Sequence, residues 1–210
     1  MQRDASRMAL AALHRAGIER PDAIIASTAL GCLDDTERFL ADMHDAAGAL
    51  LSPLPFMRST HNTVAGQLAL MLRCDGPNIT HAQGMHGFHA SMVETMLMLH
   101  EHPEWRILLI AIDERTELLE RVVGALDPAV RVGAGGDAFV LTAMARPDDV
   151  ACINWLEANG GAPFAADASN GMHGSLVAQL AGETLSLGAR NPLRIASGAG
   201  EDTDLLIAPC

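Results

Sequence analysis

The chain has 210 residues, of which 49% are apolar and 19% charged, and its formal net charge is −12. This length suits one domain with a sizeable core, so we expect residues 1–210 to form a single domain. The acidic balance argues against nucleic acid and anionic membranes as partners, because both need a basic surface. Residues 1–20 lack the apolar centre of a signal peptide, and no apolar run is long enough to span a bilayer. We therefore predict a cytoplasmic protein.

The composition also restricts the core and the cysteine chemistry. With 19 glycines and only 3% aromatic residues, the core must consist mainly of Ala, Leu, Ile, Val and Met. Such a core suits tightly packed α/β layers. The four cysteines are scattered without a CxxC pair, which indicates reduced, structural thiols and provides no catalytic candidate.

The first part of the chain alternates between helical and strand patterns. Apolar residues at helical spacing predict a helix over 5–16, and a short apolar run predicts a buried strand over 22–28. Helical spacing returns over 35–51, and we expect the prolines of 52–55 to end that helix. Another helix is predicted over 60–73.

The alternation continues through the middle of the chain. A strand is predicted over 78–82, and the glycines of 84–87 predict an abrupt turn into a helix over 88–100. The clearest buried strand is expected over 106–113, followed by a helix over 114–126. Strands that alternate with helices indicate a layered α/β fold with a largely parallel sheet.

The order of elements changes after residue 130. A glycine-rich turn precedes a predicted strand over 137–142, and another apolar run occupies 151–156. We expect one more helix over 171–180 and a final strand over 205–208. No internal repeat or linker interrupts the sequence.

Three segments carry a resemblance to a known family. The segment 59–70 contains Asn-x-x-Ala-Gly-Gln, 76–85 begins Gly-Pro and leads through a strand into a turn, and 133–141 is a glycine-rich turn followed by a strand. In this order and spacing they resemble the β-ketoacyl synthases, most strongly over residues 5–145. The resemblance implies a thiolase-like α/β fold, corresponding to the N-terminal half of a ketosynthase, with a mixed, largely parallel sheet and helices on its faces.

The departures from that family bear on activity. Aligned on Gly76 and Pro77, the position of the family's nucleophilic cysteine holds Met85. A thioether has no proton to lose and cannot form the acyl thioester that a thiolate forms. The His-Gly-Thr-Gly-Thr motif of the family's second half is missing as well. We therefore predict no catalytic residue for condensation, and no cofactor or metal.

A ketosynthase-like chain without its cysteine resembles a chain-length factor, and short forms resemble the companion subunits of aryl polyene synthases. This resemblance implies a heterodimer with a full-length ketosynthase in fatty acid or polyketide elongation. It also implies contact with acyl carrier protein, mainly through the partner because both proteins are acidic. In the family, the strand matching 78–82 pairs with its counterpart across a two-fold interface.

The resemblance implies a set of candidates for the acyl pocket and the interface. They are Met57, His61, Asn62, Asn78, Thr80, Met85, His86, Phe88 and Met92. The three methionines are expected to line the closed end of a long apolar channel, because methionine is flexible and polarizable. Ordinary core packing is an equally good interpretation of each. Smaller residues at Met85 or Phe88 would then lengthen the product.

The histidines have simpler interpretations than a metal site. His81, His86 and His89 lie on a predicted strand, turn and helix, so their side chains should diverge. His61 and Asn62 are expected to make hydrogen bonds at a helix N-terminus. Two further histidines, at 100 and 102, lie where the dipole of the preceding helix would favour positive charge.

Two other functions stay open at the level of sequence. One is an enzyme, a malonyl decarboxylase or acyltransferase that uses residues other than cysteine, with His86 as the candidate. The other is a degenerate protein that acts only as a scaffold or as a self-associating dimer. Product analysis with and without the chain would separate the scaffold from the chain-length factor, and His86→Ala would test the enzyme.

Overall fold

The structure of the chain is a computed structural model that describes residues 1–45, 50–128, 132–144, 152–157, 193–195 and 203–208. In chain order, its elements are α1 (Gln2–Arg15), β1 (Ala23–Thr28), α2 (Leu33–Asp45), α3 (Pro53–Ser59), α4 (Thr63–Leu72), β2 (Asn78–Ala82), the 3₁₀ turn η1 (Gly84–His86), α5 (Gly87–Glu101), β3 (Arg106–Asp113), α6 (Glu117–Leu126), β4 (Gly135–Thr142), β5 (Cys152–Glu157), β6 (Leu193–Ile195) and β7 (Thr203–Ala208).

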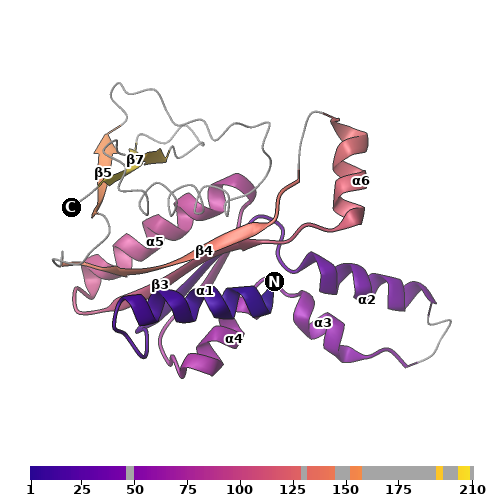
Figure 1. The fold of residues 1–210 in the computed structure, drawn as a ribbon, viewed down its shortest axis with the longest axis horizontal. Coiled ribbons are helices and arrows are strands. Elements are labelled where there is room, and N and C mark those ends of the chain that lie inside the picture. The colour runs from indigo at the N-terminus through magenta and orange to yellow at the C-terminus, as the bar shows by residue number, and fades with distance from the viewer. Residues whose placement is uncertain (46–49, 129–131, 145–151, 158–192, 196–202, 209–210) are drawn as a thin grey trace.

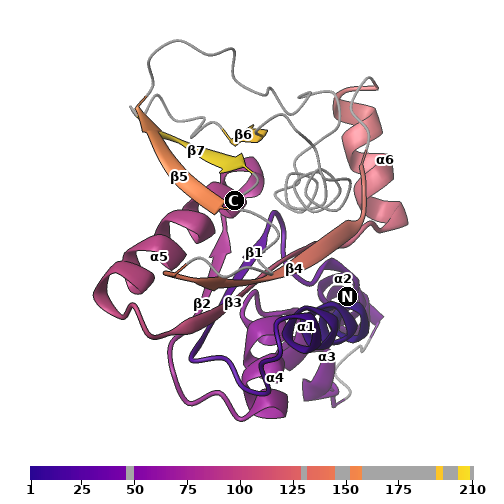
Figure 2. The same ribbon diagram turned by 60° about the vertical axis from the view of Figure 1, so that its left-hand side comes forward.

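The main sheet has four strands in the order β2-β1-β3-β4 (Figure 1). Strand β1 pairs in parallel with β2 and β3, and β4 pairs antiparallel with β3. Helix α5 covers one side of this sheet, and α1 and α4 cover the other (Figure 2). The predicted α/β fold with a mixed, largely parallel sheet is confirmed.

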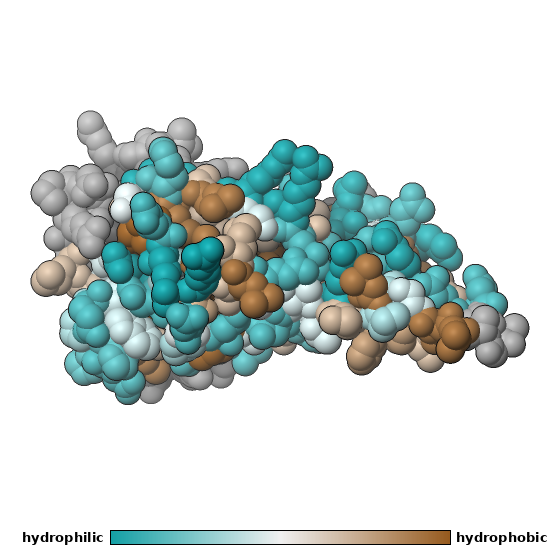
Figure 3. Space-filling model, turned by 90° about the horizontal axis from the view of Figure 1, so that it is seen from below, coloured by the Kyte–Doolittle hydropathy of each residue, from teal (hydrophilic) through white to brown (hydrophobic). Residues whose placement is uncertain are grey.

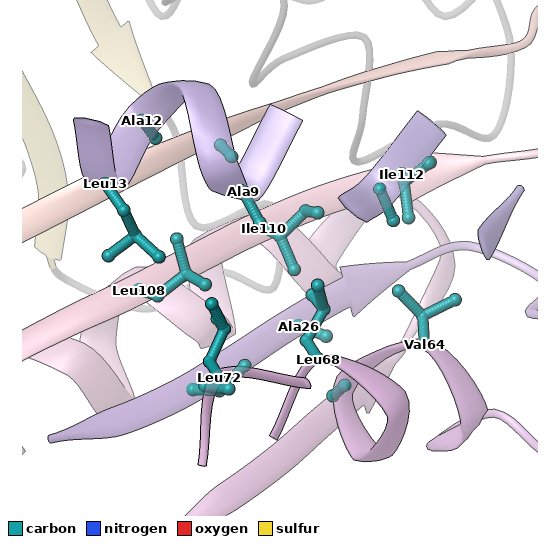
Figure 4. Close-up of a cluster of buried hydrophobic side chains, with 14 of the residues drawn as sticks. Ala9, Ala12, Leu13, Ala26, Val64, Leu68, Leu72, Leu108, Ile110 and Ile112 are labelled. Atoms are coloured by element: carbon teal, nitrogen blue, oxygen red, sulfur yellow. The ribbon is translucent and has the colours of Figure 1, made fainter. Parts of the chain in front are cut away.

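Two hydrophobic layers enclose the central strands. Along β1 and β3, alternate side chains such as Ile24 and Leu108 face α1 and α4, and the intervening ones such as Ile25 and Leu109 face α5. All four are fully buried. A parallel strand covered on both faces is apolar at nearly every position, which explains why these runs were easy to recognise in the sequence. Figure 4 shows the layer between β3 and the two helices α1 and α4.

Helix α4 confirms one sequence pattern in detail. The predicted stripe of Val64, Leu68 and Leu72 is buried against the sheet, together with Ala65. The helix ends at Arg73, whose φ of 53° is left-handed, and the Arg73 amide donates to the Leu70 carbonyl at 3.4 Å. The helix therefore stops where the strand β2 must begin its approach to the sheet.

The predicted helix over 35–51 is wrong at its end. Helix α2 is described as far as Asp45, residues 46–49 of the predicted range lie outside the described residues, and Leu50 and Leu51 are not helical. The prolines that were expected only to break a helix instead begin α3. Ser52 is its N-cap and accepts a hydrogen bond from the Leu54 amide at 3.4 Å, and Pro53 takes the first helical position. Proline is tolerated there because that amide has no partner within the helix.

A close approach of two strands explains one glycine at the start of β4. A Cβ atom on Gly136 would lie 2.4 Å from the Ala111 carbonyl oxygen of β3. No side chain fits at that distance, so this position requires glycine. The predicted strand over 137–142 begins two residues earlier, at Gly135.

The last described strands form a second, antiparallel sheet in the order β5-β7-β6. Strands β5 and β7 match the two predicted runs, and the short strand β6 was not predicted. The helix predicted over 171–180 lies outside the described residues. The expectation of a single domain over 1–210 stays a prediction.

Candidate functional site

The three parallel strands of the main sheet end on the same edge. Strand β1 ends at Thr28, β2 at Ala82 and β3 at Asp113. In open α/β sheets, ligands bind beyond the carboxyl ends of the strands, where the following loops leave the sheet. This edge, with the loops that follow these strands, is therefore the candidate functional site.

A buried carboxylate organises the centre of this edge. The side chain of Asp113 is only 5% exposed. Its Oδ1 accepts hydrogen bonds from the Thr28 hydroxyl at 2.9 Å and from the Ala29 amide at 2.6 Å. The Thr28 hydroxyl oxygen accepts in turn from the Gly31 amide at 3.0 Å. Hydrogen bonds to a charged acceptor are stronger than neutral ones, so Asp113 fixes the loop between β1 and α2.

The side chain of His61 packs against that fixed loop. Gly31 has a φ of +79°, and a Cβ atom there would lie 2.8 Å from the His61 Cδ2 atom. Glycine is therefore required at this position both by its left-handed backbone and by the imidazole beside it. This contact brings the corner between α3 and α4 next to the end of β1.

The expected hydrogen-bonding role at a helix N-terminus is wrong for Asn62 and stays a prediction for His61. Asn62 is the N-cap of α4, but its side chain makes no capping hydrogen bond. Its Oδ1 instead accepts from the Thr80 hydroxyl of β2 at 2.8 Å. The side chain of Asn62 thus connects the start of α4 to the edge strand. The sequence pattern identified the residues but not the partner.

The turn before α5 has the sharp geometry that the sequence predicted. Gly84 has a φ of +56°, and Gly84–His86 form the 3₁₀ turn η1, with Met85 in its middle. At the start of α5, a Cβ atom on Gly87 would lie 3.0 Å from the Ser27 Oγ atom and 3.3 Å from the His81 carbonyl oxygen. Glycine therefore lets the helix start directly against the ends of β1 and β2.

The three histidines of this region have different environments. His86 is exposed and caps α5 without a side-chain hydrogen bond, whereas His89 is buried. His81 is half-buried on β2, and its Nε2 atom has no hydrogen-bond partner within the described part of the chain. Burial lowers the pKa of His81, and the Glu94 carboxylate opposes this effect. Among the described residues, no group of His, Cys, Asp or Glu could hold a metal ion.

The structure places the apolar candidates in different surroundings. Phe88 and Met92 lie on α5 and are buried between this helix and the sheet. The centroid of the Phe88 ring lies 6.3 Å from that of Phe139. Met57 is 63% exposed on α3. Of Met57 and Met92, only Met92 belongs to a hydrophobic cluster of the described residues. Their role at the closed end of an acyl channel stays a prediction.

Strand β2 has an open edge in this structure. It is the outer strand of the main sheet, and its residues are half-buried or exposed, in contrast to the fully buried β1. Asn78 is half-buried at the start of β2, and its Oδ1 atom is buried without a hydrogen-bond partner among the described residues. An open strand edge with an unsatisfied polar atom is suited to further pairing.

The buried thiols have no features of a nucleophile. Burial, with the nearby carboxylates of Glu114 and Asp35, raises the pKa of the Cys32 thiol to about 12. Burial also raises the pKa of Cys74. Nucleophilic cysteines have lowered pKa values and partial exposure, so these two are structural. The expectation of structural thiols is met for Cys32 and Cys74.

The end of α5 shows how its two terminal histidines are used. His100 lies in the last turn of the helix, and His102 is its C-cap. The His102 ring stacks on Trp105 with centroids 4.0 Å apart and planes inclined by 9°. This histidine therefore closes the helix against an aromatic ring, away from the carboxyl edge of the sheet.

Sequence reasoning missed the residues that anchor the site. Thr28 and Asp113 end two predicted strands, but neither these two residues nor Gly31 was predicted to have a role in the site. One available signal was the carboxylate of Asp113 at the end of an otherwise apolar strand. Its partners could not be found in this way, because Thr28 lies 85 residues away in the sequence.

A family comparison matches this architecture. Residues 2–119 match the family "Beta-ketoacyl synthase, N-terminal domain", which is more than half of the chain. The chain therefore belongs to the β-ketoacyl synthase N-terminal domain family. This confirms the resemblance drawn from the sequence. A search of curated proteins found no match.

Solved structures share the fold at low sequence identity. A ketosynthase in complex with its chain length factor, from Xenorhabdus doucetiae, is 17% identical with a TM-score of 0.64, covering 97% of this chain and 76% of that chain. The ishigamide ketosynthase/chain length factor is 18% identical with a TM-score of 0.56, covering 65% of this chain and 41% of that one. A β-ketoacyl synthase from Burkholderia phymatum is 14% identical with a TM-score of 0.50, covering 60% and 33%.

These comparisons establish the thiolase-like fold of a ketosynthase N-terminal half. The chain spans less than half of the second and third of these structures. In the described part of the chain, no helix has the length and apolar character needed to cross a bilayer.

Proposed function

We propose that the chain is a non-catalytic, chain-length-limiting subunit that pairs with an active β-ketoacyl synthase in fatty acid or aryl polyene-type polyketide elongation. The observation that carries this proposal is Met85 in the turn before α5, at the position aligned with the family's nucleophilic cysteine. A thioether there cannot accept the growing acyl chain, so condensation would need a partner that carries the thiolate. Acyl carrier protein would reach the complex mainly through that partner.

The open edge of β2 supports pairing as the mode of association. Two sheets can join when their edge strands pair across a two-fold axis, because the free amides and carbonyls then become hydrogen-bonded. Two ketosynthase complexes with similar folds are described as ketosynthase and chain length factor. By analogy with them, we infer that a full-length ketosynthase occupies this edge.

The first experiment is light scattering of the chain co-expressed with a full-length ketosynthase from the same cell. A stable one-to-one complex is the expected result. A chain that stays monomeric or homodimeric with every such synthase contradicts the proposal, and the cysteine-independent enzyme based on His86 then becomes the hypothesis to test.

A proline on the edge strand would test the mode of pairing. The Ile24 amide of β1 donates to the Pro77 carbonyl at 2.9 Å, and Ile24 lies opposite Asn78. In a parallel ladder, alternate residues bond to the same neighbour, so the amide of Thr80 faces away from β1. Thr80→Pro should prevent the complex, whereas the matched control Thr80→Val keeps the amide and should retain it. A complex of normal affinity with Thr80→Pro would contradict pairing through β2.

The product distribution of the complex tests the chain-length role. Met85→Ala is the sharper variant, because Phe88 is 1% exposed in the core and its truncation would cost about 3–5 kcal/mol of stability. We expect longer acyl chains from the complex that contains Met85→Ala, measured by mass spectrometry. An unchanged product distribution from an intact complex would contradict a role of Met85 in the acyl pocket. The chain would then only stabilise the partner synthase.

A further inference from the structure

Two polar atoms without hydrogen-bond partners are buried on neighbouring strands under α5. Strand β1 places Ile25 in the layer under this helix, and Ser27, two residues later, faces the same way. Ser27 lies opposite His81 of β2 in the parallel register, so the two side chains share this face. Within the described residues, neither the Ser27 Oγ atom nor the His81 Nε2 atom has a hydrogen-bond partner.

This environment suits a neutral imidazole at His81. A protonated imidazole carries an N–H donor on both ring nitrogens. The donor on the buried Nε2 atom would find no acceptor among the described residues, and a buried donor without an acceptor is costly. A neutral ring with its proton on Nδ1 avoids this cost. The site therefore opposes protonation of His81 through its geometry.

Among the described residues, Glu94 is the charged group that acts on His81. Burial lowers the pKa of His81, and the Glu94 carboxylate of α5 opposes this effect. Strand β1 places only the uncharged Ser27 at this level, and α4, which packs on the other face of the sheet, contains no charged or titratable residue. The other titratable groups at the start of α5 are His86, which is exposed, and His89, which is buried.

The water that still reaches His81 comes from the open edge of β2. His81 is half-buried, whereas Ser27 beside it is fully buried between the sheet and α5. Strand β1 and the helices α4 and α5 enclose β2 on its other sides, and β2 is the outer strand. A protonated imidazole can turn towards water past this edge. A strand paired along β2 would close that route and remove the remaining water.

We propose that protonation of His81 controls the pairing of β2 with its partner strand: the neutral imidazole permits pairing, and the imidazolium opposes it. The inference rests on the proposed function and adds to it a regulation by pH. A chain with a charged His81 must release one proton to solvent before the edge can close. The attraction of Glu94 is present in the free chain as well, so it does not offset the loss of water. The complex is therefore strongest above the pKa of His81 in the free chain and weakens as the pH falls below it.

The test is the affinity of the chain for the full-length ketosynthase that co-purifies with it, measured by calorimetry at pH 7.5 and pH 5. For the unmodified chain, the Kd should rise about threefold or more on acidification, as expected when one proton must leave on binding. His81→Gln keeps a polar side chain that cannot be protonated, and should lose most of this rise. The matched control is His14→Gln, an exposed histidine on α1, which should keep it.

Two further measurements identify the proton. At pH 6, in two buffers of different ionisation enthalpy, the binding enthalpies should differ for the unmodified chain because the buffer takes up the released proton. They should differ less for His81→Gln. Glu94→Gln removes the carboxylate that favours the imidazolium, and should move the rise in Kd to lower pH. Circular dichroism should show that all three variants are folded.

The outcomes separate this inference from the proposed function. A complex that forms at pH 7.5 and has the same pH dependence with His81→Gln as with the unmodified chain would overturn the pH control and leave the proposed function intact. A rise in Kd that Glu94→Gln does not move would contradict the pH control as well. If no synthase binds the unmodified chain at either pH, both proposals are overturned.

Discussion

The central strands and the arm formed by α2 and α3 (residues 33–45 and 50–59) use the same kinds of apolar residue in opposite ways. Strand β3 is buried on both faces between α5 and the pair α1 and α4, whereas the arm exposes its leucines and methionines (Figure 3). The difference lies in the packing partners, because helices cover both faces of the central strands, whereas no residue of α2 or α3 is buried. Apolar content therefore does not by itself indicate where a segment of this chain is buried.

The largest expected effect is in the core. Leu108 is fully buried between β3 and the helices α1 and α4, and Leu108→Ala should lower the free energy of unfolding by about 2–5 kcal/mol. The same truncation in the arm, Leu40→Ala, should change it by no more than about 0.5 kcal/mol, because Leu40 is exposed. Urea unfolding of the two variants measures both values. Similar losses would mean that the arm is buried in solution.

The anchor between the two regions should have an intermediate effect. Asp113→Asn replaces the charged acceptor of the Thr28 and Ala29 hydrogen bonds, and should lower the free energy of unfolding by about 1–3 kcal/mol. Amide exchange should become faster over residues 29–37, where the loop enters α2. The matched control is Asp45→Asn, an exposed carboxylate on the arm, which should change neither quantity. Unaltered exchange in Asp113→Asn would show that the arm is oriented without this anchor.

The smallest expected effect concerns pH and the open edge strand. Because burial lowers the pKa of His81, the folded chain binds a proton at this site less readily than the unfolded chain does. The stability from neutral His81 is present above its ordinary pKa of about 6.5 and is lost as the pH falls from there towards the lowered value. His81→Gln should therefore lose less thermal stability than the unmodified chain between pH 7.5 and pH 5. Equal losses would contradict a buried, neutral imidazole.

Local patterns were sufficient for most of the main sheet and for the family. The apolar runs of β1 and β3, the stripe on α4 and the glycine turn before α5 each follow from neighbouring residues and their spacing. Patterns failed where two signals competed. Proline at the end of a helical pattern suggests a break, but after Ser52 it begins α3, and only the path of the chain decides between these outcomes.

The sequence by itself determined the fold class, the family and the absence of a thiol at position 85, because each depends on residue identity and order. Tertiary structure alone decided that Asp113 holds the loop after Thr28, that Asn62 bonds to Thr80, and that the arm stays uncovered. These are contacts between residues up to 85 positions apart in the chain. Hydrogen-bond partners and burial depend on which elements the folded sheet brings side by side, and spacing along the sequence does not encode them.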